Sequence, residues 1–173
     1  MAKSDSFFIR ATLDCNNDNS YQETTIDLGA YVNALGKSVL RIHNIAVTFS
    51  DSTGRSSTVN SEAAAQFQLL TQSEAPSIGS TSAGIILPSD KSVISSGKIA
   101  VDGAGGVATY VSTDYDNLPQ LWTNGYLVAV DAIYLGGAAS SGFAGDVYCS
   151  VTMECTVETM NTAAAMALAL SQQ

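Results

Sequence analysis

Residues 146–158 alternate between apolar and polar side chains, and this pattern constrains the fold more than any other feature of the chain. One phase holds Val147, Cys149, Val151, Met153, Cys155 and Val157, and the other holds Tyr148, Ser150, Thr152, Glu154, Thr156 and Glu158. Successive side chains of a β-strand point to opposite faces, so the alternation predicts a long strand that is buried on one face. Such a strand needs a second layer of structure to cover it.

Residues 38–50 also predict a long strand, with one irregularity. Its apolar positions change phase along the segment, from Leu40 and Ile42 to Ile45, Val47 and Phe49. A β-bulge or bend near His43 and Asn44 would bring both halves onto one buried face.

Shorter runs of strand-forming residues complete an all-β pattern. They lie at residues 6–13, 23–28, 64–71, 83–87, 95–101 and 107–112, between clusters of Gly, Ser, Asn and Asp. This spacing is typical of a sandwich or barrel and not of βαβ units. Residues 126–135 are apolar on nearly both phases, which predicts a central strand covered by a second sheet on one side and by a loop or a neighbouring subunit on the other.

Few segments favour helix or turn. Residues 30–35 predict a short helical turn with Gly36 after it, and residues 162–171 predict a helix that Thr159, Asn161 or Thr162 could cap. Asn124-Gly125 is compatible with a hairpin turn or with a short loop ahead of a strand. Residues 72–82 have the composition of a loop, either a surface loop or an interface arm. We therefore divide the chain into a β-sandwich domain, residues 1–158, and a helical tail, residues 159–173.

The charge balance disfavours contact with nucleic acid. Seven basic residues against sixteen acidic ones give a formal net charge of −9, and no Lys or Arg follows Lys98. Such a chain binds phosphate backbones poorly. The start of the sequence has no signal-peptide core, and no apolar run reaches the roughly 20 residues that span a bilayer. The three cysteines, Cys15, Cys149 and Cys155, lack metal-site spacing and predict small buried side chains in a protein made in the cytoplasm.

Two acidic clusters are candidate cation sites. Asp14, Asn16 and Asp18 alternate as at the start of a calcium loop, but Asn19 and Thr25 stand where an EF-hand loop needs Gly and Glu. Because Asn and Asp side chains bond their own backbone in turns, an Asx-rich turn is the preferred interpretation. Asp114 and Asp116 could share a cation between subunits, although a solvated loop is preferred there too.

Other candidate residues also favour structural roles. His43 has no second histidine or cysteine motif with which to hold a metal, so a hydrogen-bonded histidine at a bend is preferred over a catalytic one. No G-x-S-x-G motif supports a hydrolase. Trp122, Tyr126 and Tyr134 could form a platform that stacks on sugars, but core or interface packing is preferred. We therefore predict no enzyme, no catalytic residues, no cofactor and no metal.

The order of elements resembles a single jelly-roll capsid subunit of a virus. The resemblance rests on the N-terminal strand Phe7-Phe8-Ile9-Arg10, on the helical turn before Ser38-Val39-Leu40-Arg41-Ile42-His43, and on the long final strand that ends at Glu158. It implies eight strands in two packed sheets and a subunit that assembles with itself and with other capsid proteins. Residues 1–10 depart from the basic arm of many genome-packaging capsid proteins, since they hold only Lys3 and Arg10 against Asp5.

Three functions follow as expectations. The first is a virion shell subunit that self-associates through the tail and residues 126–135, with the genome contacted by another protein or separated by an internal membrane. The second is a lectin-like or cupin-like ligand-binding module, and the third is a phage accessory or spike protein, expected as a trimer. Fold resemblance alone does not decide among them.

Overall fold

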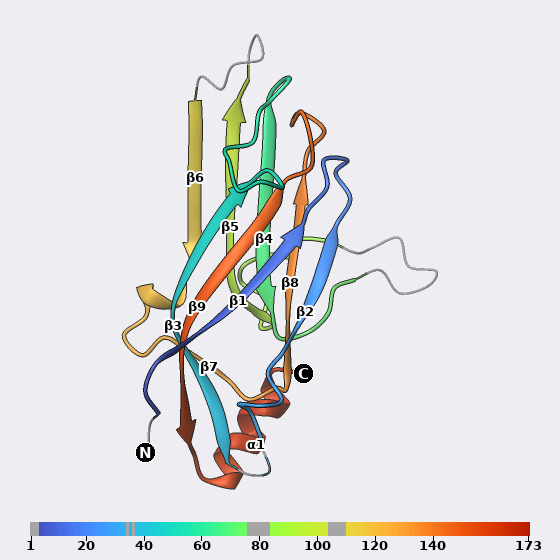
Figure 1. Cartoon of the computed structure of the whole chain (residues 1–173). Helices are drawn as coiled ribbons and strands as arrows, with labels where there is room; N and C mark the ends of the chain where they lie inside the picture. Colours follow the sequence, from blue (N-terminus) through green and yellow to red (C-terminus); the bar gives the residue numbers. More distant parts are fainter. Residues whose placement is uncertain (1–3, 34, 36, 76–83, 104–109) are drawn as a thin grey trace.

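Two antiparallel sheets face one another in a computed structural model of the chain, which describes residues 4–33, 35, 37–75, 84–103 and 110–173, with backbone only at 110–117. The first sheet has the strand order β1 (Phe7–Asp14), β9 (Tyr148–Thr159), β3 (Ser38–Ser50) and β7 (Tyr126–Val128). The second has the order β2 (Gln22–Asp27), β8 (Ala132–Ala139), β4 (Ala63–Leu70), β5 (Val93–Asp102) and β6 (Tyr110–Asn117). Figure 1 shows the two layers.

The pairing is nested, as in a long hairpin that has been rolled up. β1 pairs with β9, β2 with β8, β3 with β7, and β4 with β5. Successive strands before β4 and after β6 alternate between the two sheets, and β6 extends the second sheet beside β5. This is the jelly-roll order. The predicted all-β, jelly-roll sandwich is confirmed.

The alternating residues of β9 form the centre of the core. Cys149, Val151, Met153 and Cys155 are all buried and face the inner residues of the second sheet, which include Phe67 and Ile133. Both β9 cysteines and Cys15 are free and buried, as expected for small apolar side chains. Burial raises the pKa of the Cys15 and Cys155 thiols to about 12, so these groups are poor nucleophiles at neutral pH.

The phase change in β3 is a β-bulge. The register against β9 shifts between Ile42 and Asn44, where the extra residue is His43. Leu40, Ile42 and Ile45 are all buried as a result. The predicted irregularity is confirmed at the predicted position.

The prediction of one strand across residues 126–135 is wrong. β7 belongs to the first sheet and β8 to the second, and residues 129–131 carry the chain between them. The Leu28 N–H donates to the Asp131 carbonyl at 2.8 Å in this crossing. Ala129 and Val130 are buried there, so the two apolar phases reflect a chain that crosses between sheets and not a strand covered on both faces.

Two further expectations need correction. Residues 84–87 belong to no sheet, and the rest of the predicted strand at 83–87 lies outside the described residues. Asn124-Gly125 is not a hairpin turn, because residues 121–123 before it form no strand and β7 after it pairs with β3. The short loop is the correct alternative. It follows the 3₁₀-helix η2 (Pro119–Leu121), and it needs glycine, since a Cβ on Gly125, at φ +60°, would lie 2.2 Å from the Ile42 carbonyl oxygen.

Helical structure agrees with prediction at the tail and differs slightly near residue 30. The tail helix α1 (Thr162–Ser171) has the predicted bounds, and the Asn161 carboxamide caps it by accepting from Ala164 N–H at 2.8 Å. The turn near 30–35 begins earlier, at Leu28, whose carbonyl accepts from Tyr31 and Val32 N–H. Gly36 lies outside the described residues.

Candidate assembly surface

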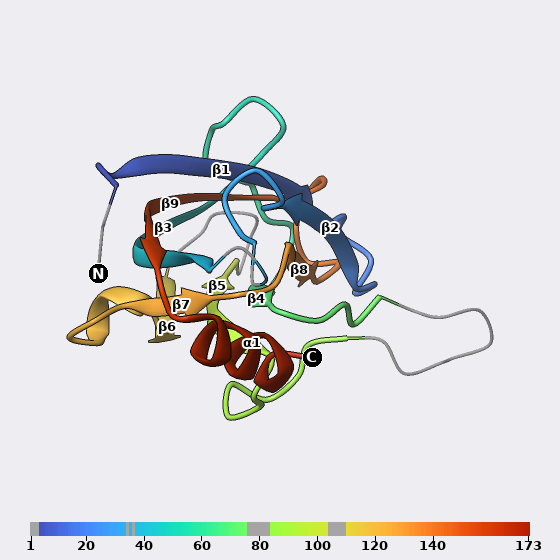
Figure 2. The same cartoon turned by 90° about the horizontal axis from the view of Figure 1, so that it is seen from below.

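The tail helix α1 packs against its own sandwich. Ala165 is fully buried against Val39 of β3 and Ala129, with Leu127 and Leu168 beside them. Figures 1 and 2 place α1 at the end of the sandwich where β9 finishes and β3 begins. The outer cover of residues 126–135, expected from a loop or a neighbouring subunit, therefore comes in part from the chain's own helix.

Gln172, just after α1, fixes the helix in place. Its carboxamide donates to the Leu127 carbonyl at 2.7 Å and accepts from Ala129 N–H at 2.9 Å. Its main-chain carbonyl accepts from the Thr71 hydroxyl at 2.9 Å. Gln172 is 3% exposed, so its buried carboxamide satisfies main-chain groups at the edge of β7 in place of a neighbouring strand.

The opposite side of α1 is apolar and faces solvent. Its exposed apolar residues are Ala163, Met166, Ala167 and Leu170, spaced at i, i+3, i+4 and i+7, and we name them the α1 stripe. The polar Ser171 is exposed at the end of the helix. Met166 is 43% exposed and Leu170 is 68% exposed. Residues 159–173 contain no charged side chain. An uncharged apolar stripe on a firmly held helix is typical of a contact surface.

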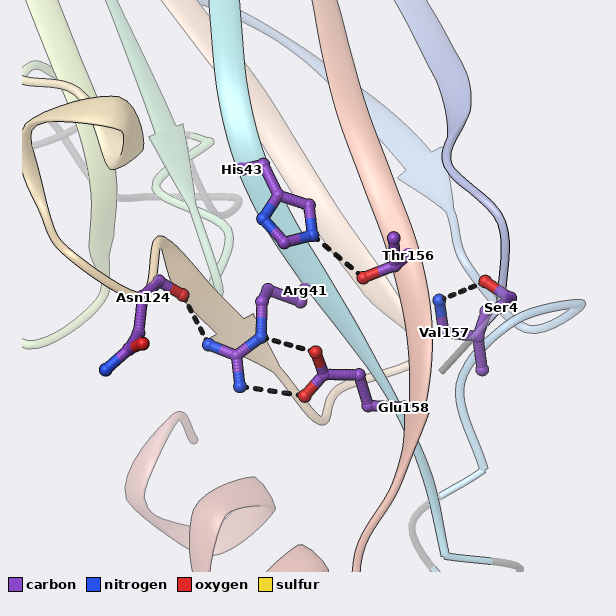
Figure 3. Close-up of polar contacts among 7 residues, drawn as sticks. All are labelled: Ser4, Arg41, His43, Asn124, Thr156, Val157 and Glu158. Atoms are coloured by element: carbon purple, nitrogen blue, oxygen red, sulfur yellow. Dashed lines mark hydrogen bonds and ion pairs between the residues drawn. The ribbon is translucent and has the colours of Figure 1, made fainter. Parts of the chain in front are cut away.

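A buried ion pair lies on the outer face of the first sheet, next to α1 (Figure 3). Arg41 of β3 binds Glu158 of β9 through two hydrogen bonds of 2.7 and 2.8 Å, and the side chains are 13% and 7% exposed. Arg41 also donates to the Asn124 carbonyl. The hydrogen bond to Glu158 raises the pKa of Arg41 above its ordinary value. The pair therefore joins β3, β9 and the loop before β7.

His43 makes a hydrogen bond at an irregular strand pair, as its preferred interpretation expects. The residue lies at the bulge of β3, and its Nε2 is 2.9 Å from the Thr156 hydroxyl of β9 (Figure 3). The neighbouring carboxylate, Glu158, is engaged by Arg41 through both oxygens. This geometry favours a histidine that stabilises an irregular strand pair over a proton-transfer group.

The Asp14–Asp18 segment is an Asx-rich turn, as preferred from the sequence. Asp14 Oδ1 accepts from Asn16 N–H at 2.9 Å, and Asn16 has φ +54°. Asp18 accepts from the hydroxyl and N–H of Ser20, and the hydroxyl bond is the main cause that lowers the Asp18 pKa. Both carboxylates thus bond the turn itself. Among the described residues, no group of three or more His, Cys, Asp or Glu side chains could hold a metal ion.

The remaining candidates do not form one site. Trp122 is 55% exposed on the loop after η2, Tyr126 packs against the core from the first sheet, and Tyr134 belongs to the second sheet. The three rings therefore do not make a sugar-stacking platform. The side chains of Asp114 and Asp116 lie outside the part of the chain that the structure describes.

Sequence reasoning missed the Arg41–Glu158 pair and the role of Gln172. Arg41 and Glu158 lie on the polar phases of their strands, and alternation alone assigns that phase to solvent. The sequence did carry one indication of the pair, because opposite charges lie on the outer phases of two long strands. Nothing local distinguishes Gln172 from its neighbour Gln173.

Comparison with known proteins gives matches only among solved structures. No protein-family model matches the chain, and no curated protein matches it. The structural neighbours are viral capsid jelly-roll proteins. VP1 of Trichodysplasia spinulosa-associated polyomavirus, solved with sialylated glycooligomers, is 11% identical with a TM-score of 0.45, over 88% of this chain and 95% of that one.

Two other neighbours cover similar shares of the chain. The VP1 pentamer of Human Polyomavirus 6 is 10% identical with a TM-score of 0.44, over 87% of this chain and 94% of that one. The structure of Cocksfoot mottle virus is 9% identical with a TM-score of 0.40, over 93% of this chain and 100% of that one. At such identities the fold rests on the strand order described above. Within the described residues, no helix is long and apolar enough to cross a membrane.

Proposed function

We propose that this protein is a non-enzymatic structural subunit of a virion shell that associates with copies of itself through the α1 stripe. The observation that carries the proposal is the solvent-facing stripe on a helix whose other side is already packed and fixed by Gln172. The jelly roll is used by capsid and lectin domains alike, so the fold permits this function without requiring it.

Charge supports the choice of α1 as the contact. Copies that each carry a net charge of −9 repel one another, and the repulsion is weakest where surfaces are neutral. The tail is uncharged, and its exposed Met166 and Leu170 offer apolar area to bury. Self-association at this surface avoids bringing acidic side chains together.

Light scattering and negative-stain imaging of the purified chain test the proposal. We expect wild type to form regular large species, and we expect Met166→Lys and Leu170→Lys to abolish them while the circular dichroism spectrum stays unchanged. Ser52→Lys is the matched control, since it adds the same charge at an exposed position at the far end of β3 and keeps assembly. A wild-type monomer at every salt and calcium concentration would overturn the proposal, and a stable trimer would favour a spike protein.

We further propose that the subunit does not bind the genome directly, and that another protein or an internal membrane lies between shell and genome. As a shell subunit, the protein would be made in the host cytoplasm and would then lie in the virion. The excess of sixteen acidic over seven basic residues supports it. Fluorescence anisotropy with labelled DNA and RNA at physiological salt should detect no binding, and saturable binding would contradict this part of the proposal.

A further inference from the structure

Two large apolar side chains are exposed to solvent at η2 and directly after it. Leu121 is 62% exposed and Trp122 is 55% exposed. A single exposed apolar residue is ordinary on a protein surface, but two adjacent ones, which include the only tryptophan of the chain, form a patch that a partner can cover. We name Leu121 and Trp122 the η2 knob.

The main chain that carries the η2 knob is fixed on both sides. The Gln120 carboxamide accepts from Ile45 N–H at 3.1 Å and donates to the Ile45 carbonyl at 2.9 Å, so η2 is attached to β3 beside its bulge. After the knob, the Asn124 carbonyl accepts from Arg41 of the buried ion pair. Because the loop is already fixed, little conformational entropy is lost when a partner covers its apolar side chains.

The η2 knob and the α1 stripe both lie in uncharged segments. No charged residue occurs in the sequence between Asp116 and Asp131, and none occurs in residues 159–173. Copies with a net charge of −9 repel one another. Contact between these two surfaces therefore buries apolar area without burying a charge from either segment.

The side chains of the α1 stripe suit an aromatic partner. Ala163 and Ala167 lie four residues apart, as do Met166 and Leu170, so the helix places a row of small side chains beside a row of large ones. A flat ring such as the indole of Trp122 can rest on the small row and pack against the large one. Methionine sulfur also makes favourable contacts with aromatic rings. The stripe contains no aromatic residue of its own.

The η2 knob and the α1 stripe lie apart on one chain. Figures 1 and 2 both show the η2 turn, in yellow-orange, to one side of the dark red α1. Contact between knob and stripe therefore joins two copies through different surfaces. Each added copy brings a further knob or stripe, so such head-to-tail contacts continue until a ring or a larger assembly closes.

We propose that the η2 knob of one copy packs on the α1 stripe of a second copy. The inference rests on the self-association proposed above and names the surface that the α1 stripe meets. It gives each subunit two different contact surfaces. Contact between two α1 stripes would instead use one surface twice and would stop at a dimer.

Photo-crosslinking tests the contact directly. The variant Trp122→p-benzoyl-phenylalanine keeps a large aromatic side chain, and its ¹⁴N and ¹⁵N subunits are mixed before they assemble. Cleavage after glutamate releases residues 159–173 as one peptide, because Glu158 precedes them. We expect mixed-isotope crosslinks from position 122 to this peptide, and none from the same substitution at the exposed Ser52. Crosslinks to other segments only, or none in protein that assembles, would overturn the inference and leave the proposed function intact.

Substitutions separate the two surfaces. Trp122→Lys removes the knob and keeps the stripe, and we expect association to weaken about thirtyfold while the circular dichroism spectrum stays unchanged. Leu170→Lys removes the stripe and keeps the knob. A mixture of these two variants should form a complex of one copy of each that grows no further, because each pair retains one intact knob and one intact stripe. Ser52→Lys is the matched control and should associate like wild type.

Two outcomes of this experiment would overturn the inference. One is a Trp122→Lys variant that associates like wild type, and the other is a mixture of the two variants that stays monomeric. A failure of wild type to associate at all would instead overturn the proposed function on which the inference rests.

Discussion

At the scale of single residues, the Arg41–Glu158 pair departs clearly from the pattern of strand alternation. Each side chain projects from the outer face of the first sheet, where alternation places solvated residues, yet both are at least 87% buried. The bidentate geometry satisfies the guanidinium and the carboxylate together. The loss of either partner would remove from a buried charged group the opposite charge that lies against it.

We expect Arg41→Met to lower the free energy of unfolding by about 3 kcal/mol, because it removes two hydrogen bonds and the positive charge from the buried Glu158 carboxylate. The double variant Arg41→Met/Glu158→Met should recover much of that loss. Urea unfolding followed by circular dichroism measures both. Arg55→Met, in an exposed turn, is the control and should change stability by less than about 0.5 kcal/mol. If the loss of stability in the double variant equals the sum of the losses in Arg41→Met and Glu158→Met alone, the two residues are not coupled.

Residue-scale prediction from the sequence succeeded where a side chain is governed by its own strand. The inward phase of β9, the bulge beside His43 and the Asx turn at Asp14 all follow from local pattern. The burial of Glu158 does not, because it depends on a loop and a helix that come together only in the folded chain. Alternation identifies the two faces of a strand but not what covers the outer one.

At the scale of elements, local sequence likewise predicts α1 but not the two strands within residues 126–135. The bounds of α1 follow from its Ala-rich and Leu-rich composition and from Asn161 as a cap, which are local properties. Residues 126–135 form two strands because β3 pairs with one half and β2 and β4 pair with the other. Nothing in the apolar run itself marks the point at which the chain leaves one sheet for the other.

Gln172 is what makes α1 a fixed element. We expect Gln172→Leu to destabilise the protein by about 2 kcal/mol, because it leaves the Leu127 carbonyl and the Ala129 N–H buried without partners. Amide hydrogen exchange in α1 should become faster than in the core strands. Gln173→Leu is the matched control, since residue 173 is exposed, and both its stability and its exchange should match wild type. Unchanged exchange in Gln172→Leu would mean that apolar packing alone holds the helix.

At the scale of the whole molecule, the nested pairing of strands leaves the two ends of the sandwich with different chemistry. The end that α1 covers carries an uncharged apolar stripe, whereas the opposite end carries polar turns such as residues 51–55, where Asp51 accepts from Thr53 and Arg55. The jelly-roll class was predictable from strand spacing and order. This difference between the ends was not, because it depends on which side of α1 packs inward.

Salt dependence distinguishes an apolar contact from an ionic one. Copies with a net charge of −9 repel over a Debye length of about 30 Å at 0.01 M salt and about 8 Å at 0.15 M. The burial of Met166 and Leu170 is much less sensitive to salt than this repulsion. We therefore expect the association constant, measured by light scattering, to rise as sodium chloride increases across that range. An association constant that falls with salt would mean that charge pairs hold the subunits together, and would place the contact away from the uncharged α1 stripe.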